Sequence, residues 1–425
     1  MADRRSSFTK SLFDKELPAD WTLVPARAVV DRTQYGLNEP GASNGGTPIV
    51  GMKDIANGAV NLSNLGTIDG DANAWTAYVL RRDDILLNRT NSPDLVGKVG
   101  IVREDSQAVF ASYLVRLHVN KERGDPAFLN YWFNGSIAQR ALKRLSTRGV
   151  SQANINPTEF LKHCPVPLPP LPEQHKIGEI LRTWDDAIQK LTALGAAKSR
   201  DFQALARQFF GPCHPSHQRS NGTWNRFELG DVFQERSECG SDGEVLLSIT
   251  MSDGVIDRED VGRKDTSNED KSRYKLILPG DIGYNTMRMW QGVSGLSSLR
   301  GIVSPAYTIV TPDNKNISAR YAAHLFKSRR MVFDFQRYSQ GMTSDTWGLK
   351  FPAFSKIAVF LPPIDLQRKQ ADLLDAMTAE IAALDKQRLA VERQKRGLMQ
   401  KLLTGEWRIN TVASDLRKPE AAANG

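Results

Sequence analysis

The sequence has few cysteines and no long apolar runs. Cys164, Cys213 and Cys239 are the only cysteines among 425 residues, which is too few for a disulfide framework and typical of a protein of the reducing cytosol. No apolar run approaches the roughly 20 residues that a membrane helix needs. No apolar segment follows the first residues, so we also expect no secretory signal. These absences predict a cytoplasmic protein without a membrane partner.

The sequence also lacks the common motifs of nucleotide and catalytic sites. Gly97-Lys98 is followed by valine, so it does not form a phosphate-binding loop. No G-x-G-x-x-G follows a predicted strand, and Asn156-Pro157-Thr158-Glu159 lacks the second proline and the aromatic residue of adenine methyltransferases. The six histidines are scattered, and they indicate no Ser-His-Asp or Cys-His arrangement. We therefore predict no catalytic residue and favour binding over catalysis.

Four side chains near the middle of the chain are of zinc-ligand type. They are Cys213, His214, His217 and Cys239. Their spacing fits no standard zinc finger, and we interpret the stretch as a solvated turn between two domains. We predict no metal and no cofactor in this chain.

The composition is that of a folded protein that could bind a polyanion. Hydrophobic residues make up 40% and aromatic residues 8% of the chain, enough for real cores. Lys and Arg (56) exceed Asp and Glu (48), for a formal charge of +8. Such a charge permits a nucleic-acid partner without establishing one.

The chain contains two copies of one unit. The segment Pro169-Pro-Leu-Pro-Glu-Gln-His-Lys-Ile recurs 193 residues later as Pro362-Pro-Ile-Asp-Leu-Gln-Arg-Lys-Gln. With small gaps, Asn88 matches Asn285, 197 residues later. Further apolar pairs keep the offset of 193: Leu181 with Leu374, Ile188 with Ile381, Leu205 with Leu398. A period this long predicts a duplicated pair of domains.

Each copy ends in a long predicted helix that starts after a Pro-Pro pair. The first runs from about Glu173 to Phe210, and roughly 38 residues make a rod of roughly 57 Å. The apolar residues of both helices keep one heptad register, which is typical of a coiled-coil seam. The alternative is an amphipathic helix lying on its own domain. The predicted seam consists of Ile177, Leu181, Trp184, Ile188, Leu191, Leu205, Phe209, Leu374, Met377, Ile381, Leu384, Val391, Leu398 and Leu402.

We expect a mixed α/β (α+β) fold, with two similar globular domains separated by two long antiparallel coiled-coil helices. Antiparallel pairing needs only short connections, and it predicts a dumbbell with a pseudo-two-fold axis, in which the chain start and chain end lie close together. Strands are predicted at residues 77–80, 84–87, 98–102 and 114–119, and helical segments at 126–145 and 318–335. The expected divisions are residues 1–168 and 212–361 for the globular domains, 169–211 and 362–408 for the helices, and 409–425 for a disordered tail.

The duplicated Pro-Pro segment, followed in the first copy by Ile-x-x-Ile-Leu-x-x-x-Asp-x-x-Ile, resembles the specificity subunits of type I restriction-modification enzymes. Residues 46–55, 88–98 and 149–154 add further matches to this family. The second copy is looser, since Glu-Gln becomes Leu366-Gln367.

This resemblance implies that each globular half is a target-recognition domain for one half of a split, asymmetric site on double-stranded DNA. The helices would set the number of unread base pairs between the halves. It also implies two modification (methyltransferase) subunits and restriction (translocase and nuclease) subunits as partners. S-adenosylmethionine, ATP and magnesium would be bound by those partners, and the chain itself would be non-catalytic. The resemblance further implies a bacterial or archaeal cytoplasmic protein, associated with the nucleoid when bound to DNA.

Loop residues of the two domains are candidates for DNA contact, because Arg, Lys, Asn and Gln can read base edges and aromatic side chains can pack beside them. The alternative for each is a solvated loop residue. The candidates are Tyr35, Lys53, Arg89, Asn91, Ser92, Lys98, Arg148 and Gln152 in the first domain, and Lys271, Arg273, Arg288, Gln291, Thr343, Ser344 and Asp345 in the second.

Two other functions stay open at this point. One is a self-contained methyltransferase or nuclease, against which the missing cofactor and carboxylate motifs argue. The other is a structural spacer that holds two protein partners apart without binding DNA.

Overall fold

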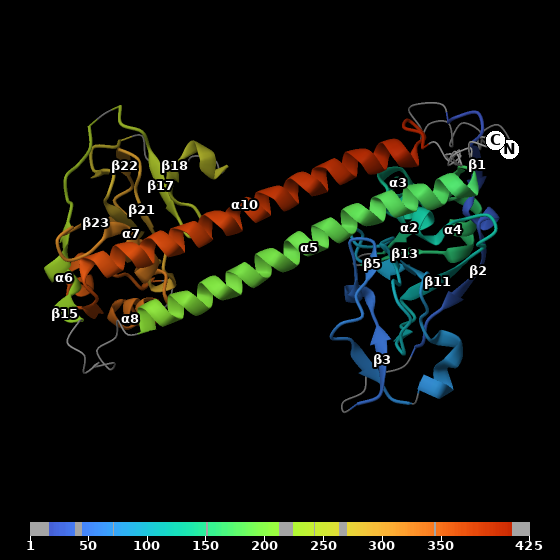
Figure 1. The fold of residues 1–425 in the computed structure, drawn as a ribbon, viewed down its shortest axis with the longest axis horizontal. Helices are drawn as coiled ribbons and strands as arrows, with labels where there is room; N and C mark the ends of the chain where they lie inside the picture. Colours follow the sequence, from blue (N-terminus) through green and yellow to red (C-terminus); the bar gives the residue numbers. More distant parts are fainter. Residues whose placement is uncertain are drawn as a thin grey trace, which may run out of the picture. The chain divides into compact units, whose positions relative to one another are not determined.

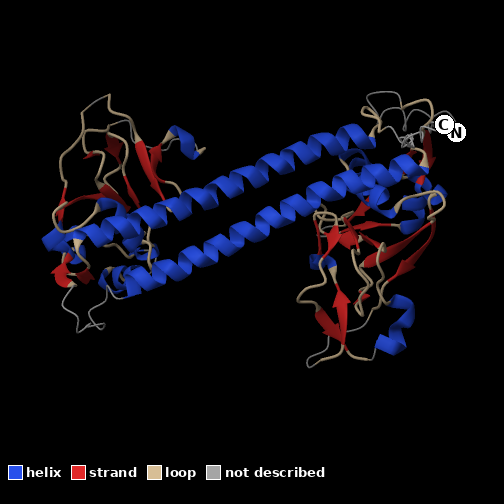
Figure 2. Ribbon diagram, viewed as in Figure 1, coloured by secondary structure: helices blue, strands red, loops and turns tan. Residues whose placement is uncertain are grey.

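The computed structural model describes residues 17–38, 45–70, 72–149, 152–211, 224–241, 243–262, 270–343 and 346–409. Helices and strands are mixed throughout (Figure 2), so the predicted mixed α/β class is confirmed. The chain divides into two compact units. Unit 1 comprises Met1–Lys190 with Gln387–Gly425, and unit 2 comprises Leu191–Lys386.

Two long helices, α5 (Leu171–Phe210) and α10 (Ile364–Leu403), contain the points at which the chain passes from one unit to the other (Figure 1). Each has 40 residues, which corresponds to about 60 Å of helix. Each begins directly after a Pro-Pro pair, because the residue before a proline disfavours helical backbone while proline itself fits the first turn. The boundary between the units falls within both helices, so each helix gives one half to each unit.

Within unit 1, the first half of α5 and the last half of α10 run antiparallel. Glu173, at the start of α5, binds Arg408, just beyond the end of α10, with an Oε1–Nε distance of 2.9 Å. Further along α5, Asp185 binds Lys395 with an Oδ1–Nζ distance of 2.5 Å. In unit 2 the remaining halves are joined by an ion pair between Lys198 and Glu380 at 2.9 Å.

The residues of the predicted seam differ in burial along the helices. Ile177, Leu181, Leu374 and Leu402 are buried, where globular cores pack on the helices. The other seam positions are half-buried. Where no further layer covers two packed helices, the side chains on their shared face stay half-buried.

Unit 1 is built on a six-stranded sheet with the order β2-β11-β7-β9-β5-β4. Two three-stranded sheets, β10-β3-β6 and β12-β13-β8, and the pair β1-β14 complete it. The strands are β1 (Thr22–Pro25), β2 (Val30–Tyr35), β3 (Thr47–Val50), β4 (Ile55–Ala56), β5 (Ala59–Val60), β6 (Gly66–Ile68), β7 (Ile85–Asn88), β8 (Thr90–Asn91), β9 (Val99–Ile101), β10 (Val109–Phe110), β11 (Leu114–Val119), β12 (Ser146–Arg148), β13 (Ala153–Ile155) and β14 (Pro165–Leu168). The helices are α2 (Pro126–Asn134), α3 (Ser136–Leu145) and α4 (Pro157–His163), with 3-10 helices η1 (Ala26–Ala28), η2 (Met52–Asp54) and η3 (Ala72–Tyr78).

The strand prediction for residues 77–80 is wrong. This segment ends η3 and continues without regular structure. Its carbonyl groups accept hydrogen bonds from a side chain, since Arg116 Nη1 donates to the Val79 carbonyl at 3.0 Å and Arg116 Nη2 to that of Ala77. A buried guanidinium therefore satisfies the groups that a neighbouring strand would otherwise pair.

Unit 2 repeats the central sheet in shorter form, with the order β16-β23-β20-β21 and the pairs β15-β24, β17-β18 and β19-β22. The strands are β15 (Asn225–Glu228), β16 (Phe233–Glu235), β17 (Leu247–Thr250), β18 (Gly254–Asp257), β19 (Lys275–Ile277), β20 (Ile282–Asn285), β21 (Ser294–Leu296), β22 (Gly301–Val303), β23 (Tyr307–Pro312) and β24 (Ala358–Leu361). The helices are α6 (Leu229–Val232), α7 (Ala319–Phe326), α8 (Arg329–Tyr338) and α9 (Phe351–Phe354), with 3-10 helices η5 (Glu259–Val261) and η6 (Met289–Gln291).

Both predicted helical segments, 126–145 and 318–335, are pairs of helices. The first is broken at Gly135, which has extended backbone between α2 and α3. The second is broken at Lys327–Ser328, where Ser328 caps α8 by accepting a hydrogen bond from the Met331 amide. In each pair, a residue with extended backbone therefore separates the two helices.

A buried glutamine fixes the start of each long helix. Gln174 Nε2 donates to the carbonyls of Arg123 and Pro169 at 3.1 and 2.9 Å. Its Oε1 accepts from the Asp125 amide at 2.9 Å. The same three bonds recur 193 residues later, where Gln367 binds Asn316, Pro362 and Ser318. The repeat therefore extends from sequence to individual hydrogen bonds.

Candidate nucleic-acid interface

The small sheet β12-β13-β8 brings several predicted DNA-contact residues of unit 1 together. Its register places Ala153 beside Asn91. Ser92 follows β8 directly, and the amide of Gly149 donates to the carbonyl of the exposed Gln152 at 2.7 Å. Arg148 ends β12, and its side chain lies outside the described part of the structure.

Arg89 lies just before this sheet and is held from three sides. Its guanidinium lies over the ring of Tyr35, with 5.0 Å between Cζ and the ring centroid. Nη1 donates to Asn154 Oδ1 at 2.9 Å, and Nε donates to the Ser112 carbonyl at 3.3 Å. Tyr35 is 49% exposed, so the arginine and the aromatic ring form one accessible surface.

The sequence reading missed Asn154. It lies within the 149–154 motif, and its Oδ1 also accepts from the Thr90 hydroxyl at 3.0 Å. A polar residue between the buried Ala153 and Ile155 was the available signal, because alternation along a strand places it on the opposite face.

Lys98 and Lys53 do not share the surroundings of Arg89. Lys98 lines a cavity of about 670 Å³ together with Tyr131, Asp185 and Lys395. Lys53 is exposed on η2.

In unit 2, the position of Arg89 is taken by Thr286. The Leu349 amide donates to the Thr286 carbonyl at 2.8 Å, as the Ile155 amide does to the Arg89 carbonyl at 2.8 Å. The Thr286 hydroxyl is hydrogen-bonded to that of Thr308 at 2.8 Å. The backbone arrangement is therefore shared, while the side chain that it presents differs.

The candidate residues after β20 gather around η6. Arg288 and Gln291 are exposed on this turn. Trp290 packs edge-on against Trp347 at 5.5 Å between ring centroids, which brings the loop with the exposed Thr343 beside it. The candidates Ser344 and Asp345 lie outside the described residues. Lys271 and Arg273 instead precede β19.

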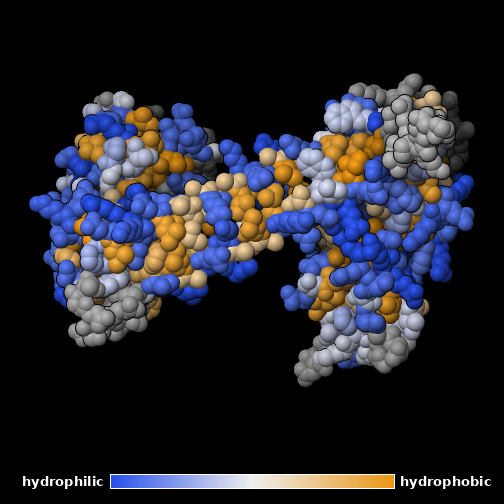
Figure 3. Space-filling view, viewed as in Figure 1, coloured by the Kyte–Doolittle hydropathy of each residue, from blue (hydrophilic) through white to orange (hydrophobic). Residues whose placement is uncertain are grey.

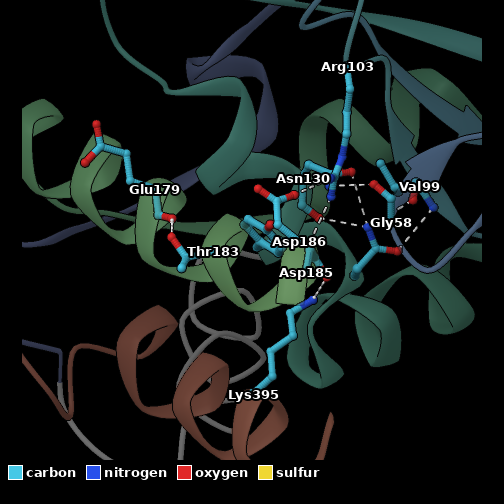
Figure 4. Close-up of polar contacts among 11 residues, drawn as sticks. Gly58, Val99, Arg103, Asn130, Glu179, Thr183, Asp185, Asp186 and Lys395 are labelled. Carbon is cyan, nitrogen blue, oxygen red and sulfur yellow. Dashed lines mark hydrogen bonds and ion pairs between the residues drawn. The ribbon is translucent and has the colours of Figure 1, made fainter. Parts of the chain in front are cut away.

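A cluster around Asp185 joins the globular part of unit 1 to both long helices (Figure 4). Tyr131 of α2 donates its hydroxyl to Asp185 Oδ2 at 2.6 Å, and Arg103 Nη2 reaches the same oxygen at 3.2 Å. Lys395 of α10 binds the other oxygen. Burial and the Asp185 carboxylate raise the pKa of Tyr131, so its hydroxyl remains a neutral donor.

Unit 2 uses other residues at the corresponding place. His324, 193 residues after Tyr131, binds Asp375 of α10 with an Nε2–Oδ1 distance of 2.7 Å. Arg320 Nε binds the same carboxylate at 2.7 Å. Both units thus use a carboxylate of a long helix to hold the helix that follows the central sheet.

A second cluster in unit 1 joins the two ends of the described chain. Glu173 is buried, accepts from Trp21 Nε1 at 3.2 Å and binds Arg408. Arg408 also binds Asp20, with an Nη2–Oδ2 distance of 2.7 Å, and the pKa of Asp20 is lowered by this hydrogen bond. Asp20 and Arg408 are therefore neighbours, as the antiparallel prediction requires.

In the described part of the chain, no group of three or more His, Cys, Asp and Glu side chains could hold a metal ion. Cys213, His214 and His217 lie outside it. Cys164 is buried, and burial raises the pKa of its thiol, whereas Cys239 is exposed. Among the described helices, none is both long and apolar enough to cross a membrane.

Comparison with protein-family models finds one similarity, in the first half of the chain. Residues 36–195, which include the Arg89 surface and the start of α5, match the model of the type I restriction modification DNA specificity domain. This part of the chain is therefore similar to that family of DNA specificity domains.

Comparisons with individual proteins extend this similarity. The chain is 24% identical over 412 residues to the putative type I restriction enzyme MjaX specificity subunit of Methanocaldococcus jannaschii, covering 93% of this chain and 96% of the relative. It is 28% identical to the type I restriction enzyme EcoBI specificity subunit of Escherichia coli, over 46% of this chain and 42% of the relative. The resemblance to type I specificity subunits is thereby confirmed.

Solved structures show the same fold. The S subunit of the type I restriction-modification system from M. genitalium matches with a TM-score of 0.61 at 15% identity, covering 92% of this chain and 97% of that one. A chain from a structure of a type I R-M system matches with a TM-score of 0.53 at 15% identity, over 92% of this chain and 100% of that one.

Proposed function

We propose that this chain is the sequence-specific DNA-binding subunit of a type I restriction-modification complex. Residues 1–168 and 212–361 form two target-recognition domains, and each recognises one half of a bipartite double-stranded site. The observation that carries the proposal is that both copies share the same backbone arrangement but present different side chains at equivalent positions. The Gln174 and Gln367 bonds are the same in both copies, and this arrangement presents Arg89 in one copy and Thr286 in the other.

An unequal pair of readers implies an asymmetric site. Arginine can donate two hydrogen bonds to one guanine, whereas a threonine paired with another hydroxyl offers a different pattern. The exposed Arg288 and Gln291 on η6 supply the polar groups of the second domain. The two half-sites therefore differ in sequence.

The long helices set the gap between the half-sites and bind the partner subunits. Two 40-residue helices joined in antiparallel register give a spacing that depends on helix length. Apolar side chains lie between hydrophilic ones along α10 (Figure 3). Leu194 on α5 and Leu373 and Leu389 on α10 are exposed, which suits a surface covered by another protein.

The catalytic steps belong to partners in this proposal. Two modification subunits carry S-adenosylmethionine and methylate adenine, and restriction subunits carry ATP and magnesium. This chain contributes recognition and assembly without catalysis, in the cytoplasm where the complex meets DNA.

The test is to map methylated adenines in cells that contain the chain with its modification subunits. A split motif with two unlike halves and a fixed gap is the expected result, and it should disappear when the chain is deleted. A salt-dependent gel shift with the purified chain, with and without modification subunits, separates DNA binding from a protein spacer. Methylation of unchanged sites after deletion of the chain would refute the proposal.

A further inference from the structure

We propose that Arg89 recognises one guanine in the half-site of the first domain, and that Asn154 is the positioning residue that holds its guanidinium for this contact. The proposal rests on the DNA-recognition function above and names the base and the residue responsible. It starts from the way in which unit 1 holds the half-buried Arg89.

The backbone of Arg89 is fixed by the two strands between which it lies. Its amide donates to the Tyr113 carbonyl at 3.0 Å, and its carbonyl accepts from the Ile155 amide at 2.8 Å. Asn88, the residue before it, is completely buried in β7. The Arg89 side chain therefore leaves the sheet from a backbone that is fixed on both sides.

The guanidinium itself is oriented by three contacts from separate segments. Tyr35 at the end of β2 lies under its plane, Ser112 accepts from Nε, and Asn154 in β13 accepts from Nη1. An arginine has five N–H donors in a planar fork. Two are engaged by Ser112 and Asn154, and Nη2 has no acceptor among the described residues. The outer edge of the fork is left with donors for a ligand.

This outer edge matches guanine in the major groove. Guanine presents the N7 and O6 acceptors side by side, and a bidentate arginine contact to them is the commonest specific contact in protein–DNA complexes. A guanidinium that is already oriented loses less conformational entropy on binding. Tyr35 and Tyr113, which are 49% and 47% exposed, flank the position. They can pack beside the base or the sugar.

The role of Asn154 can be tested separately from that of Arg89, because Asn154 accepts hydrogen bonds from two different side chains. Its Oδ1 accepts from Arg89 and also from the Thr90 hydroxyl. Replacing Asn154 with alanine removes both hydrogen bonds while residue 89 is still an arginine. Thr90→Val removes only the hydroxyl bond, so it is the matched control. Asn154→Asp keeps an acceptor oxygen in the same position and serves as the conservative variant.

The experiment is a selection of bound duplexes from a pool of randomised sites, carried out with the full chain and its modification subunits. For Arg89→Ala we expect the preference for guanine over other bases to fall by roughly 5- to 150-fold at one position of one half-site, the range for one bidentate contact. The other half-site and the gap should be unchanged. Asn154→Ala should lower the preference at the same position, whereas Thr90→Val and Asn154→Asp should retain it.

Several outcomes would overturn the inference. If Arg89→Ala weakens binding to all sequences alike and reduces the salt dependence, Arg89 contacts a phosphate. If Arg89→Ala changes the position but Asn154→Ala does not, Asn154 has no positioning role. If either variant only lowers the unfolding temperature and keeps full base preference, the contact is structural. If the complex with the wild-type chain selects no sequence at all, the proposed function fails. This result is distinguishable from each of the others.

Discussion

The buried glutamines at the starts of α5 and α10 give the sharpest stability prediction. Gln174 and Gln367 are 1% and 0% exposed, and each makes three hydrogen bonds to backbone groups of the preceding segment. Leucine has a similar volume but can make none of these bonds. The substitution therefore leaves one amide and two carbonyl groups of each site without this partner.

The magnitude follows from the cost of burying unpaired polar groups. Such a group costs about 1–3 kcal/mol, and part of the loss is offset because the glutamine amide no longer has to be desolvated. We expect Gln174→Leu and Gln367→Leu each to lower the free energy of unfolding by about 3 kcal/mol. For a domain of this size the midpoint of thermal unfolding falls by roughly 2–4 °C per kcal/mol, hence by roughly 6–12 °C.

Differential scanning calorimetry of the full chain measures this shift. Gln189→Leu on α5 and Gln394→Leu on α10 are matched controls, because both glutamines are exposed. They should change the midpoint by less than about 2 °C, since exposed substitutions usually stay within about 0.5 kcal/mol. If the buried and exposed glutamines give equal shifts, the three bonds do not anchor the helices.

Three further predictions concern the Asp185 cluster, one histidine and the helices. In urea denaturation, Asp185→Asn should lower the free energy of unfolding by about 1–3 kcal/mol, because Lys395 keeps its charge and loses the carboxylate that pairs with it. The control Asp186→Asn should lower it less, because the Asp186 side chain is 47% exposed. Equal losses for the two variants would contradict this account. Burial lowers the pKa of His118, so the unfolded chain binds this proton more readily and stability falls as the pH drops below about 6.5. His118→Gln should flatten that fall below about pH 6.5, and an unchanged slope would refute the assignment. Deleting one heptad from each long helix should shorten the gap between the half-sites and leave both half-sites unchanged, because the seam register is kept. If the methylated adenines keep their original spacing, the helices do not set the gap.

The long helices and the duplication were predictable from sequence because both rest on periodic or repeated patterns. A heptad stripe after a Pro-Pro pair depends only on local backbone geometry and on the apolar face that the helix must bury. The mixed α/β class followed from strand-like and helix-like segments in each copy. The prediction failed at residues 77–80, where a distant guanidinium from Arg116 satisfies the carbonyls.

The candidate interface was predicted less completely. Arg89, Asn91, Ser92 and Gln152 were selected by residue type, and the structure gathers them around one small sheet. Asn154, which orients Arg89, was missed because residues 89 and 154 meet only through the pairing of β8 with β13. Lys98 was selected by residue type in the same way, yet it lines the cavity beside the long helices.

The sequence alone determined the duplicated organisation, the two helices and the family resemblance, since each depends on residues that are near in the chain or repeated at a fixed offset. Tertiary structure decided which polar residues share a surface. It joined Glu173 to Arg408 across 235 residues and Asp185 to Lys395 across 210, and it set the guanidinium of Arg89 on Tyr35. Such contacts depend on how strands and helices pack in three dimensions, and no local pattern along the chain encodes which distant partners will meet.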